Sequence, residues 1–123
     1  MSQLALSHST NVRVRQLAQM MIRDHNALDN QMAAVSGIGR VPAAEASVVA
    51  DLAALSGPQF DHRYLAVLLN DHRDAIALFQ DASRNARSAP ARRLAADALP
   101  NLRGHLNSVQ HTVQVVNETP RPR

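Results

Sequence analysis

Three of the six histidines lie in apolar stripes of predicted helices. Each fills one position in a run of apolar residues spaced about three and four apart, as expected for the core-facing side of a helix. The runs are Val14, Ala18, Met21, Leu28 and Met32 around His25; Leu65, Leu68, Ala75 and Phe79 around His72; and Ala91, Ala95, Ala98, Leu102, Val109 and Val116 around His105. This spacing predicts that imidazoles from separate helices meet in the interior of the protein.

Such a meeting of imidazoles would suit a metal ion. Imidazole is a common ligand of first-row transition metals, and helical bundles hold metal sites between facing helices. Neutral histidines with one open coordination position fit Zn²⁺, Cu²⁺ or Ni²⁺, so we expect His25, His72 and His105 to bind a divalent ion. Asp29 lies one turn after His25, and Asn101 one turn before His105. Either could hold a ring nitrogen by a hydrogen bond from behind the metal ligands.

The same residues also fit a structural role without a metal. Buried histidines are usually hydrogen-bonded to a carboxylate, a hydroxyl or water. Asp61 begins the stripe of His72, where it could cap the helix, and Tyr64 could hydrogen-bond across the bundle. The alternative is thus a structural or partner-binding bundle with a buried His, Asp and Tyr network. The remaining histidines lie off the stripes and are expected to face solvent: His8, His62 and His111.

Turn and cap residues divide the chain into four predicted helices, at about 3–35, 43–55, 58–83 and 89–116. Glycines follow the first helix, Gly57 and Pro58 separate the second from the third, and Ser88 and Pro90 start the last. Pro100 should kink or break the last helix. Short connections favour antiparallel neighbours. We therefore predict an all-α, up-down-up-down four-helix bundle as one domain over residues 1–118, with a disordered tail at 119–123.

Composition narrows the classes of function. The 123 residues include no cysteine, which excludes disulfides and thiolate metal sites. The net charge is +3 and every basic residue is arginine, but the arginines are spread along the chain, so we do not expect nucleic-acid binding. No stretch is long and apolar enough to predict a membrane span. The usual nucleophile and phosphate-loop motifs are missing, which argues against an enzyme, and a homo-oligomer is left open.

Several segments resemble one protein family, and they occur in order over nearly the whole chain. They are Met21-Ile22-Arg23-Asp24-His25, Phe60-Asp61-His62-Arg63-Tyr64, Asp71-His72 with Phe79 after it, and Leu99-Pro100-Asn101-Leu102-Arg103-Gly104-His105-Leu106. The chain resembles the ferritin-like bacterial family called domain of unknown function 4142 (DUF4142). The characteristic residues of that family would map to Asp24, His25, Asp61, Tyr64, His72 and His105.

The resemblance implies a ferritin-like bundle without an assigned activity. Family members are exported bacterial proteins with a leader, so it also implies a periplasmic or secreted protein whose leader is missing from this chain. Gly104 stands where an acidic or polar residue is more usual, which puts a carboxylate ligand from that turn in doubt. A di-iron centre is not expected, because the chain has only Glu45 and Glu118 and no Glu-x-x-His pair.

Overall fold

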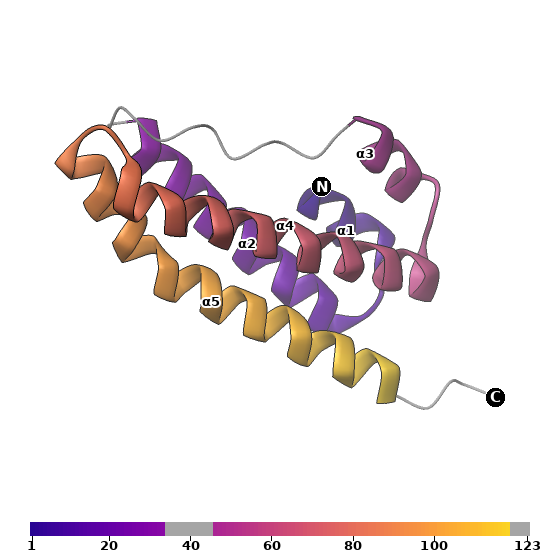
Figure 1. Ribbon diagram of the computed structural model, residues 1–123. Helices are drawn as coiled ribbons and strands as arrows, with labels where there is room; N and C mark the ends of the chain where they lie inside the picture. Colours follow the sequence, from indigo (N-terminus) through magenta and orange to yellow (C-terminus); the bar gives the residue numbers. More distant parts are fainter. Residues whose placement is uncertain (34–45, 119–123) are drawn as a thin grey trace.

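The computed structural model describes residues 1–33 and 46–118 and contains helices and connections, with no strand among these residues. In chain order the helices are α1 (Ser2–His8), α2 (Val12–Ala33), α3 (Ala46–Ala53), α4 (Gly57–Asn85) and α5 (Ala89–Glu118) (Figure 1). The all-α class is therefore confirmed. The predicted tail at 119–123 and the predicted helix ends at 35 and 43 lie outside the described residues.

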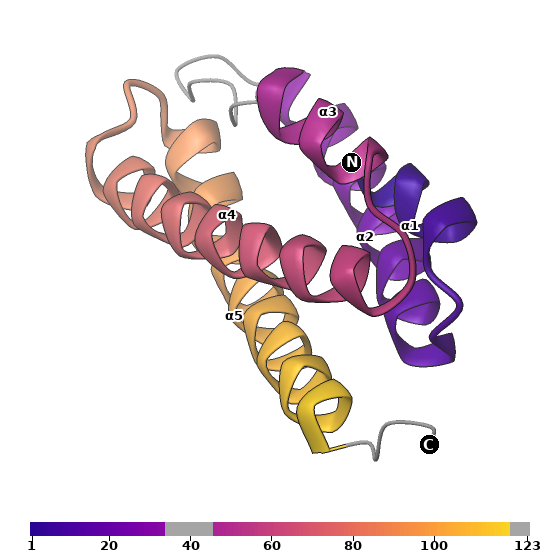
Figure 2. The same ribbon diagram turned by 90° about the vertical axis from the view of Figure 1, so that its right-hand side faces the viewer.

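The helices form a closed series of contacts. The two longest, α4 and α5, pack side by side, α2 packs on α5, and α1 packs on both α2 and α4. The backbones of α2 and α4 approach each other less closely than either approaches α1. Figure 2 shows α1 and α2 together on one side of α4. The short α3 contacts α1 and α4. The predicted order of four alternating helices is thus not confirmed, and a ferritin-like fold stays a prediction.

The first predicted helix is two helices, separated at residues 9–11. The Ser9 hydroxyl accepts a hydrogen bond from the Asn11 N–H at 3.1 Å. The Asn11 side-chain oxygen accepts bonds from the N–H groups of Arg13, at 2.9 Å, and Val14, at 3.2 Å. Asparagine is among the best residues for starting a helix in this way. The break lets α1 fold back, where it buries Ala5 against the core.

α5 begins at the cap that the sequence predicted, but Pro100 does not break the helix. The Ser88 hydroxyl caps the helix by accepting a bond from the Ala91 N–H at 3.2 Å, as predicted. The helix then continues through Pro100 without a break. Proline removes one donor to the carbonyl four residues earlier. Pro100 and Ala96 are both exposed, so water can satisfy that carbonyl and the helix persists.

The core follows the predicted stripes. Val14, Ala18 and Met21 are buried in the main cluster, together with Leu65, Leu68 and Val109. A second cluster contains Phe79, Ala98, Leu99 and Leu102. His72 and His105 stand between these two clusters on their helices, so the apolar pattern positions them as expected.

Candidate functional site

His25, His72 and His105 approach one another from α2, α4 and α5. The ring centres of His25 and His72 are 6.1 Å apart, and those of His72 and His105 are 5.8 Å apart. His72 therefore lies in the middle, with one histidine on either side. The structure brings together the three histidines that the stripes singled out.

The three side chains differ in their exposure to solvent. His72 is only 2% exposed, and the side chain of His105 is 12% exposed. His25 is exposed, although we expected it to be buried like the others. His25 lines two grooves beside α2, one toward α5 and one toward α4. His25 therefore stands at the edge of the cluster.

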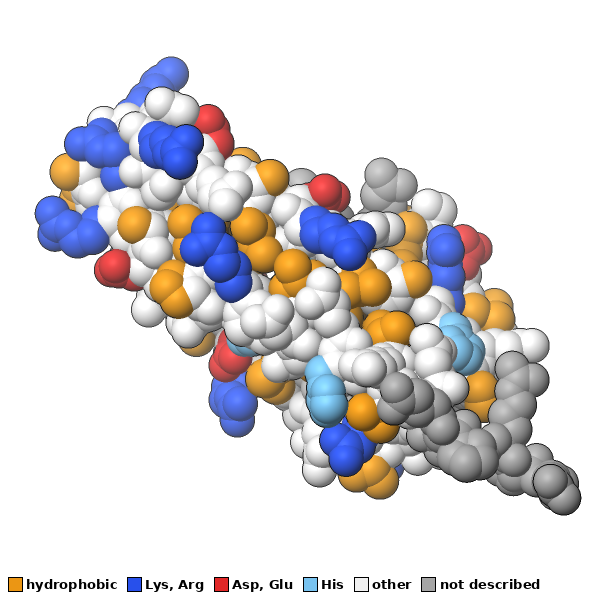
Figure 3. Space-filling model, turned by 60° about the horizontal axis from the view of Figure 1, so that its bottom comes forward, with side chains coloured by type: hydrophobic (Ala, Val, Ile, Leu, Met, Phe, Trp, Pro, Cys, Tyr) orange, Lys and Arg blue, Asp and Glu red, His pale blue; other side chains and the backbone are white. Residues whose placement is uncertain are grey.

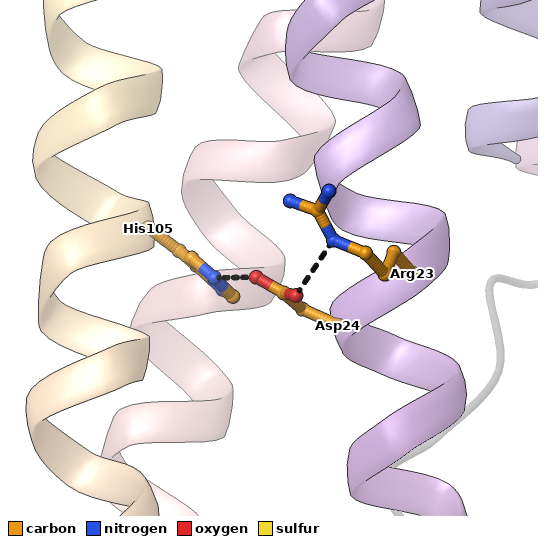
Figure 4. A network of polar contacts seen from close by, with 3 residues as sticks. All are labelled: Arg23, Asp24 and His105. Atoms are coloured by element: carbon orange, nitrogen blue, oxygen red, sulfur yellow. Dashed lines mark hydrogen bonds and ion pairs between the residues drawn. The ribbon is translucent and has the colours of Figure 1, made fainter.

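Each enclosed ring has one nitrogen hydrogen-bonded and the other unpartnered. His72 Nδ1 donates to the Leu68 carbonyl at 2.8 Å, because a carbonyl can only accept. Its Nε2 is buried without a partner. His105 Nε2 donates to Asp24 Oδ2 at 2.7 Å (Figure 4), and its Nδ1 is likewise buried without a partner. In the neutral rings, the two unpartnered nitrogens carry lone pairs.

Asp24 receives a second, weaker contact. Arg23 Nε lies 3.5 Å from Asp24 Oδ1 (Figure 4), with the Arg23 side chain 77% exposed. Exposed ion pairs of this kind contribute little to stability. The bond that orients Asp24 is therefore the one to His105.

The environment favours the neutral form of His72 and of His25. Burial lowers the pKa of His72 below its ordinary value; the Leu68 hydrogen bond opposes this, and the neighbouring histidines add to it. Burial also lowers the pKa of His25, and the Asp29 charge opposes it. Neutral imidazole is the form that binds a metal ion.

The other predicted residues divide between this cluster and a separate one. Asn101 is exposed and lines a groove between α2 and α5, together with Asp24 and His105. Asp29 is exposed beside His25. Asp61 and Tyr64 lie roughly 16 Å and 12 Å from His72 along α4, at about 1.5 Å per residue. They contact α1 instead.

The separate cluster joins α4 to α1. The Tyr64 hydroxyl and the Ser2 hydroxyl are 2.6 Å apart. Asp61 is 3% exposed, is hydrogen-bonded to the Ser9 side chain and has one oxygen without a partner. Asp61 was predicted to cap the helix, but its side chain is buried instead, because α1 folds back over the start of α4. These residues therefore do not support the histidines.

Two features of the cluster were not predicted from residue spacing. The partner of His105 is Asp24, which only the family resemblance pointed to, and the partner of His72 is a backbone carbonyl of its own helix. His8 was expected to be solvated, but its Nδ1 lies 2.7 Å from the Leu55 carbonyl, and its ring lies 5.5 Å from Phe60. The helix break at residues 9–11 was the signal that could have placed His8.

The described residues contain no group of three or more His, Cys, Asp or Glu side chains arranged to hold a metal ion as they stand. Two grooves give access to the histidines. One, of about 500 Å³, runs between α2 and α5 and is lined by His25 and His105. The other, of about 970 Å³, runs between α2 and α4 and is lined by His25 and His72.

Comparison with known proteins identifies the family. A family model described as Domain of unknown function (DUF4142) matches residues 1–112. The chain belongs to this family. The DUF4142 match includes the three histidines and Asp24. No curated protein and no solved structure matches the chain. In the described part of this DUF4142 protein, no helix combines the length and hydropathy needed to cross a membrane.

Proposed function

We propose that this DUF4142 domain binds a divalent transition-metal ion through His72 Nε2 and His105 Nδ1, with His25 as a third ligand. The observation that supports this is the state of the two enclosed rings. In each, one N–H donates to a fixed acceptor and the other nitrogen is buried without a partner. Histidine ligands in metalloproteins are held in this way, by a carboxylate or a backbone carbonyl behind them.

The imidazole rings must move slightly closer together to share one metal ion. Two imidazoles on one tetrahedral Zn²⁺ have ring centres roughly 5 Å apart, given Zn–N bonds of about 2.0–2.1 Å. The observed separations are 5.8 and 6.1 Å. Each pair must close by about 1 Å or less to share an ion. His25 is exposed and has the freedom to move, while His72 and His105 hold their positions.

The donor set narrows the choice of metal. Imidazole nitrogens with an open position suit Zn²⁺, Cu²⁺ and Ni²⁺, whereas Mg²⁺ and Ca²⁺ prefer oxygen. Zn²⁺ is the most useful probe, because it has no redox chemistry. Asp24 would orient His105 from behind, without touching the ion.

The test is a calorimetric titration of chelator-treated, untagged protein with Zn²⁺. We expect one ion per chain, and loss of most of the affinity in His72→Ala and His105→Ala. Asp24→Asn, which leaves both ligands in place, should weaken binding by roughly 10- to 100-fold. The matched control is His62→Ala, because His62 is exposed on the same helix as His72. Circular dichroism of each variant separates loss of a ligand from loss of fold.

The alternative function has a distinct outcome. A structural or partner-binding bundle would bind no stoichiometric metal, and a chelator would leave its thermal midpoint unchanged. The His105–Asp24 bond would then serve as part of a polar network in the core. Zinc affinity that is equal in wild type and in the His72→Ala, His105→Ala double variant would contradict the metal proposal.

The setting that we propose for this function is the periplasm or the exterior of the cell. It rests on the exported character that the family resemblance implies. Fractionation of cells that express the full gene product would test it, and recovery in the cytoplasmic fraction alone would contradict it. Size-exclusion chromatography with and without Zn²⁺ would show whether a homo-oligomer forms.

A further inference from the structure

Arginines occur along the whole sequence, but they are densest at the α4–α5 turn. Four lie within ten residues, and outside this stretch no ten consecutive residues contain more than two. They are Arg84, Arg87, Arg92 and Arg93. No Asp or Glu lies between Asp81 and Asp97, so the segment 82–96 carries a charge of +4. The whole chain carries +3, which leaves −1 for the rest of the sequence.

The hairpin of α4 and α5 presents these four arginines, the basic tip, at one end of the molecule. α4 ends at Asn85 and α5 begins at Ala89, so only residues 86–88 join the two helices. Small buried side chains let the helices pack closely below the turn: Ala82, Ala86, Ala91 and Ala95. On the face shown in Figure 3, Arg side chains gather toward the end with this turn. The basic tip is therefore the protruding end of a closely packed hairpin.

Three of the four guanidinium groups are free to bind a partner. Arg84, Arg87 and Arg93 are exposed. Within the described chain, no arginine of the basic tip has a carboxylate within salt-bridge distance. Arg92 differs, because it is half-buried and its Nη1 donates to the Ala86 carbonyl at 2.8 Å. Arg92 therefore holds the turn, and the other three point their charge at the surroundings.

The placement of the arginines on the helices is not the one that helix stability favours. Cations are favourable near the C-terminus of a helix and unfavourable near its N-terminus. Arg84, in the last turn of α4, agrees with this rule. Arg93 lies within the first five residues of α5, and the first turn of α5 has no acidic residue to offset it. Stability therefore accounts for Arg84 and Arg92, but not for Arg87 and Arg93.

The basic tip can recognise charge and little else. In the described part of the chain, the one large apolar side chain that is exposed is Val12, at the start of α2, and residues 82–96 contain no aromatic residue. Stable protein interfaces have an apolar or aromatic centre, and single-stranded nucleic acids stack on aromatic side chains. Specific duplex binding covers an extended face of roughly 1,000 Å² or more. A flat anionic surface fits a protruding basic tip better than any of these.

We propose that the basic tip binds the surface of a bilayer that contains anionic phospholipid, with the α4–α5 turn against the headgroups. The guanidinium groups of Arg84, Arg87 and Arg93 contact lipid phosphates, which they match with parallel N–H donors. Each arginine close to such a surface strengthens binding by about fivefold. The histidine cluster takes no part. Binding is measured with a chelator present, so its outcome does not depend on the metal proposal.

The test is co-sedimentation of the full chain with vesicles at low ionic strength. One set of vesicles is phosphatidylcholine with roughly one third phosphatidylglycerol, and the other is phosphatidylcholine alone. We expect binding to the first set and none to the second. Binding should be lost in about 1 M NaCl, where the Debye length is only about 3 Å.

Variants of the basic tip measure its share of the binding. The triple variant Arg84→Gln, Arg87→Gln, Arg93→Gln should bind the anionic vesicles roughly 100-fold more weakly. Arg92 stays in place, because it bonds to the turn. Replacing the same three arginines by Lys keeps the charge and should retain most of the affinity. Circular dichroism verifies that each variant is folded.

The matched control removes three positive charges elsewhere. Arg13, Arg15 and Arg63 are exposed, near the starts of α2 and α4. Figure 1 shows these helix starts at the other end of the molecule from the α4–α5 turn. The triple variant Arg13→Gln, Arg15→Gln, Arg63→Gln has the same net charge as the triple variant of the basic tip. It should bind the anionic vesicles within about fivefold of wild type.

Three results would overturn the proposal. The first is equal binding to vesicles with and without phosphatidylglycerol. The second is an equal loss of binding in the two triple variants, which would show that net charge alone matters. The third is tighter binding to duplex DNA than to the anionic vesicles at the same phosphate concentration, which would assign the basic tip to nucleic acid instead.

Discussion

Replacing Asp61 by Asn should stabilise the protein at neutral pH. Asp61 is 3% exposed, and its Oδ1 is buried without a partner, while the Ser9 side chain is its hydrogen-bond partner. Leaving a buried polar group unpartnered costs about 1–3 kcal/mol, and more when it is charged. Asparagine keeps the shape and the acceptor for Ser9, and it removes the charge. Its NH₂ group stays unpartnered, so we expect a net gain of about 1 kcal/mol in unfolding free energy.

The effect of Asp61 has a defined pH dependence. Burial raises the pKa of Asp61 above its ordinary value of 3.8; the Ser9 hydrogen bond and the charge of His62 oppose this. The folded state therefore keeps a proton that the unfolded state has already released. The contribution of Asp61 to stability is fully present below pH 3.8 and is lost as pH rises through its folded-state pKa. The advantage of the Asn variant should grow over this window and then level off.

The assay is urea unfolding followed by far-ultraviolet circular dichroism, because the chain has no tryptophan and one tyrosine. A gain of 1 kcal/mol corresponds to about 4 °C in thermal midpoint for a domain of this size. Asp51→Asn, at an exposed position of α3, is the control and should change stability by less than about 0.5 kcal/mol. A less stable Asp61→Asn variant at neutral pH, or an advantage that does not vary with pH, would refute the reasoning.

Three further sets of variants test other contacts by the same assay. Tyr64→Phe and Ser2→Ala should each cost about 1 kcal/mol, and the double variant no more than either, because both remove one hydrogen bond; additive losses would contradict this. Asn11→Ala should cost about 0.5–2 kcal/mol through the lost cap, with Asn11→Asp close to wild type; equal stability of all three proteins would argue against the cap. Burial lowers the pKa of His72 from its ordinary 6.5, so the folded state favours the neutral ring, and stability should fall as pH drops below 6.5. His72→Asn should flatten this slope, and an unchanged slope would show that His72 is not its source.

The apolar stripes predicted the core well. Leu65, Leu68, Phe79, Leu102 and Val109 are all buried, because periodic apolar side chains report directly which face of a helix is covered. The same periodicity singled out the three histidines whose rings approach one another. The presence of the long helices, and the side of each that faces the core, could therefore be predicted from the sequence.

The helix break and the exposure of His25 were not predicted, for different reasons. Ser9 and Asn11 are a recognisable start signal, but the apolar residues on both sides suggested one continuous helix. The exposure of His25 depends on how the other helices pack beside α2 at its level, which no pattern within α2 reports. Whether a side chain is buried depends on the helices packed against it as well as on its position in an apolar stripe.

The partner of His105 shows a further limit. Asp24 and His25 are adjacent and point about 100° apart on a helix. This is why Asp24 contacts α5 while His25 lies beside His72. Choosing among Asp24, Asp29 and Asn101 required the relative rotation of α2 and α5, which the spacing of residues within each helix does not contain.

The shortness of α1 has a consequence for the dynamics of the protein. An isolated helix of seven residues is not stable in water, where about 12–15 residues are marginal, so α1 is helical only while it is docked. Its amide protons should therefore exchange with solvent together, whenever the Ser2–Tyr64 contact opens. Met1, Ser2 and Gln3 also line the end of the α2–α4 groove. A molecule that contacts them only in the docked state slows that exchange, which links the folding of the first helix to occupancy of the groove.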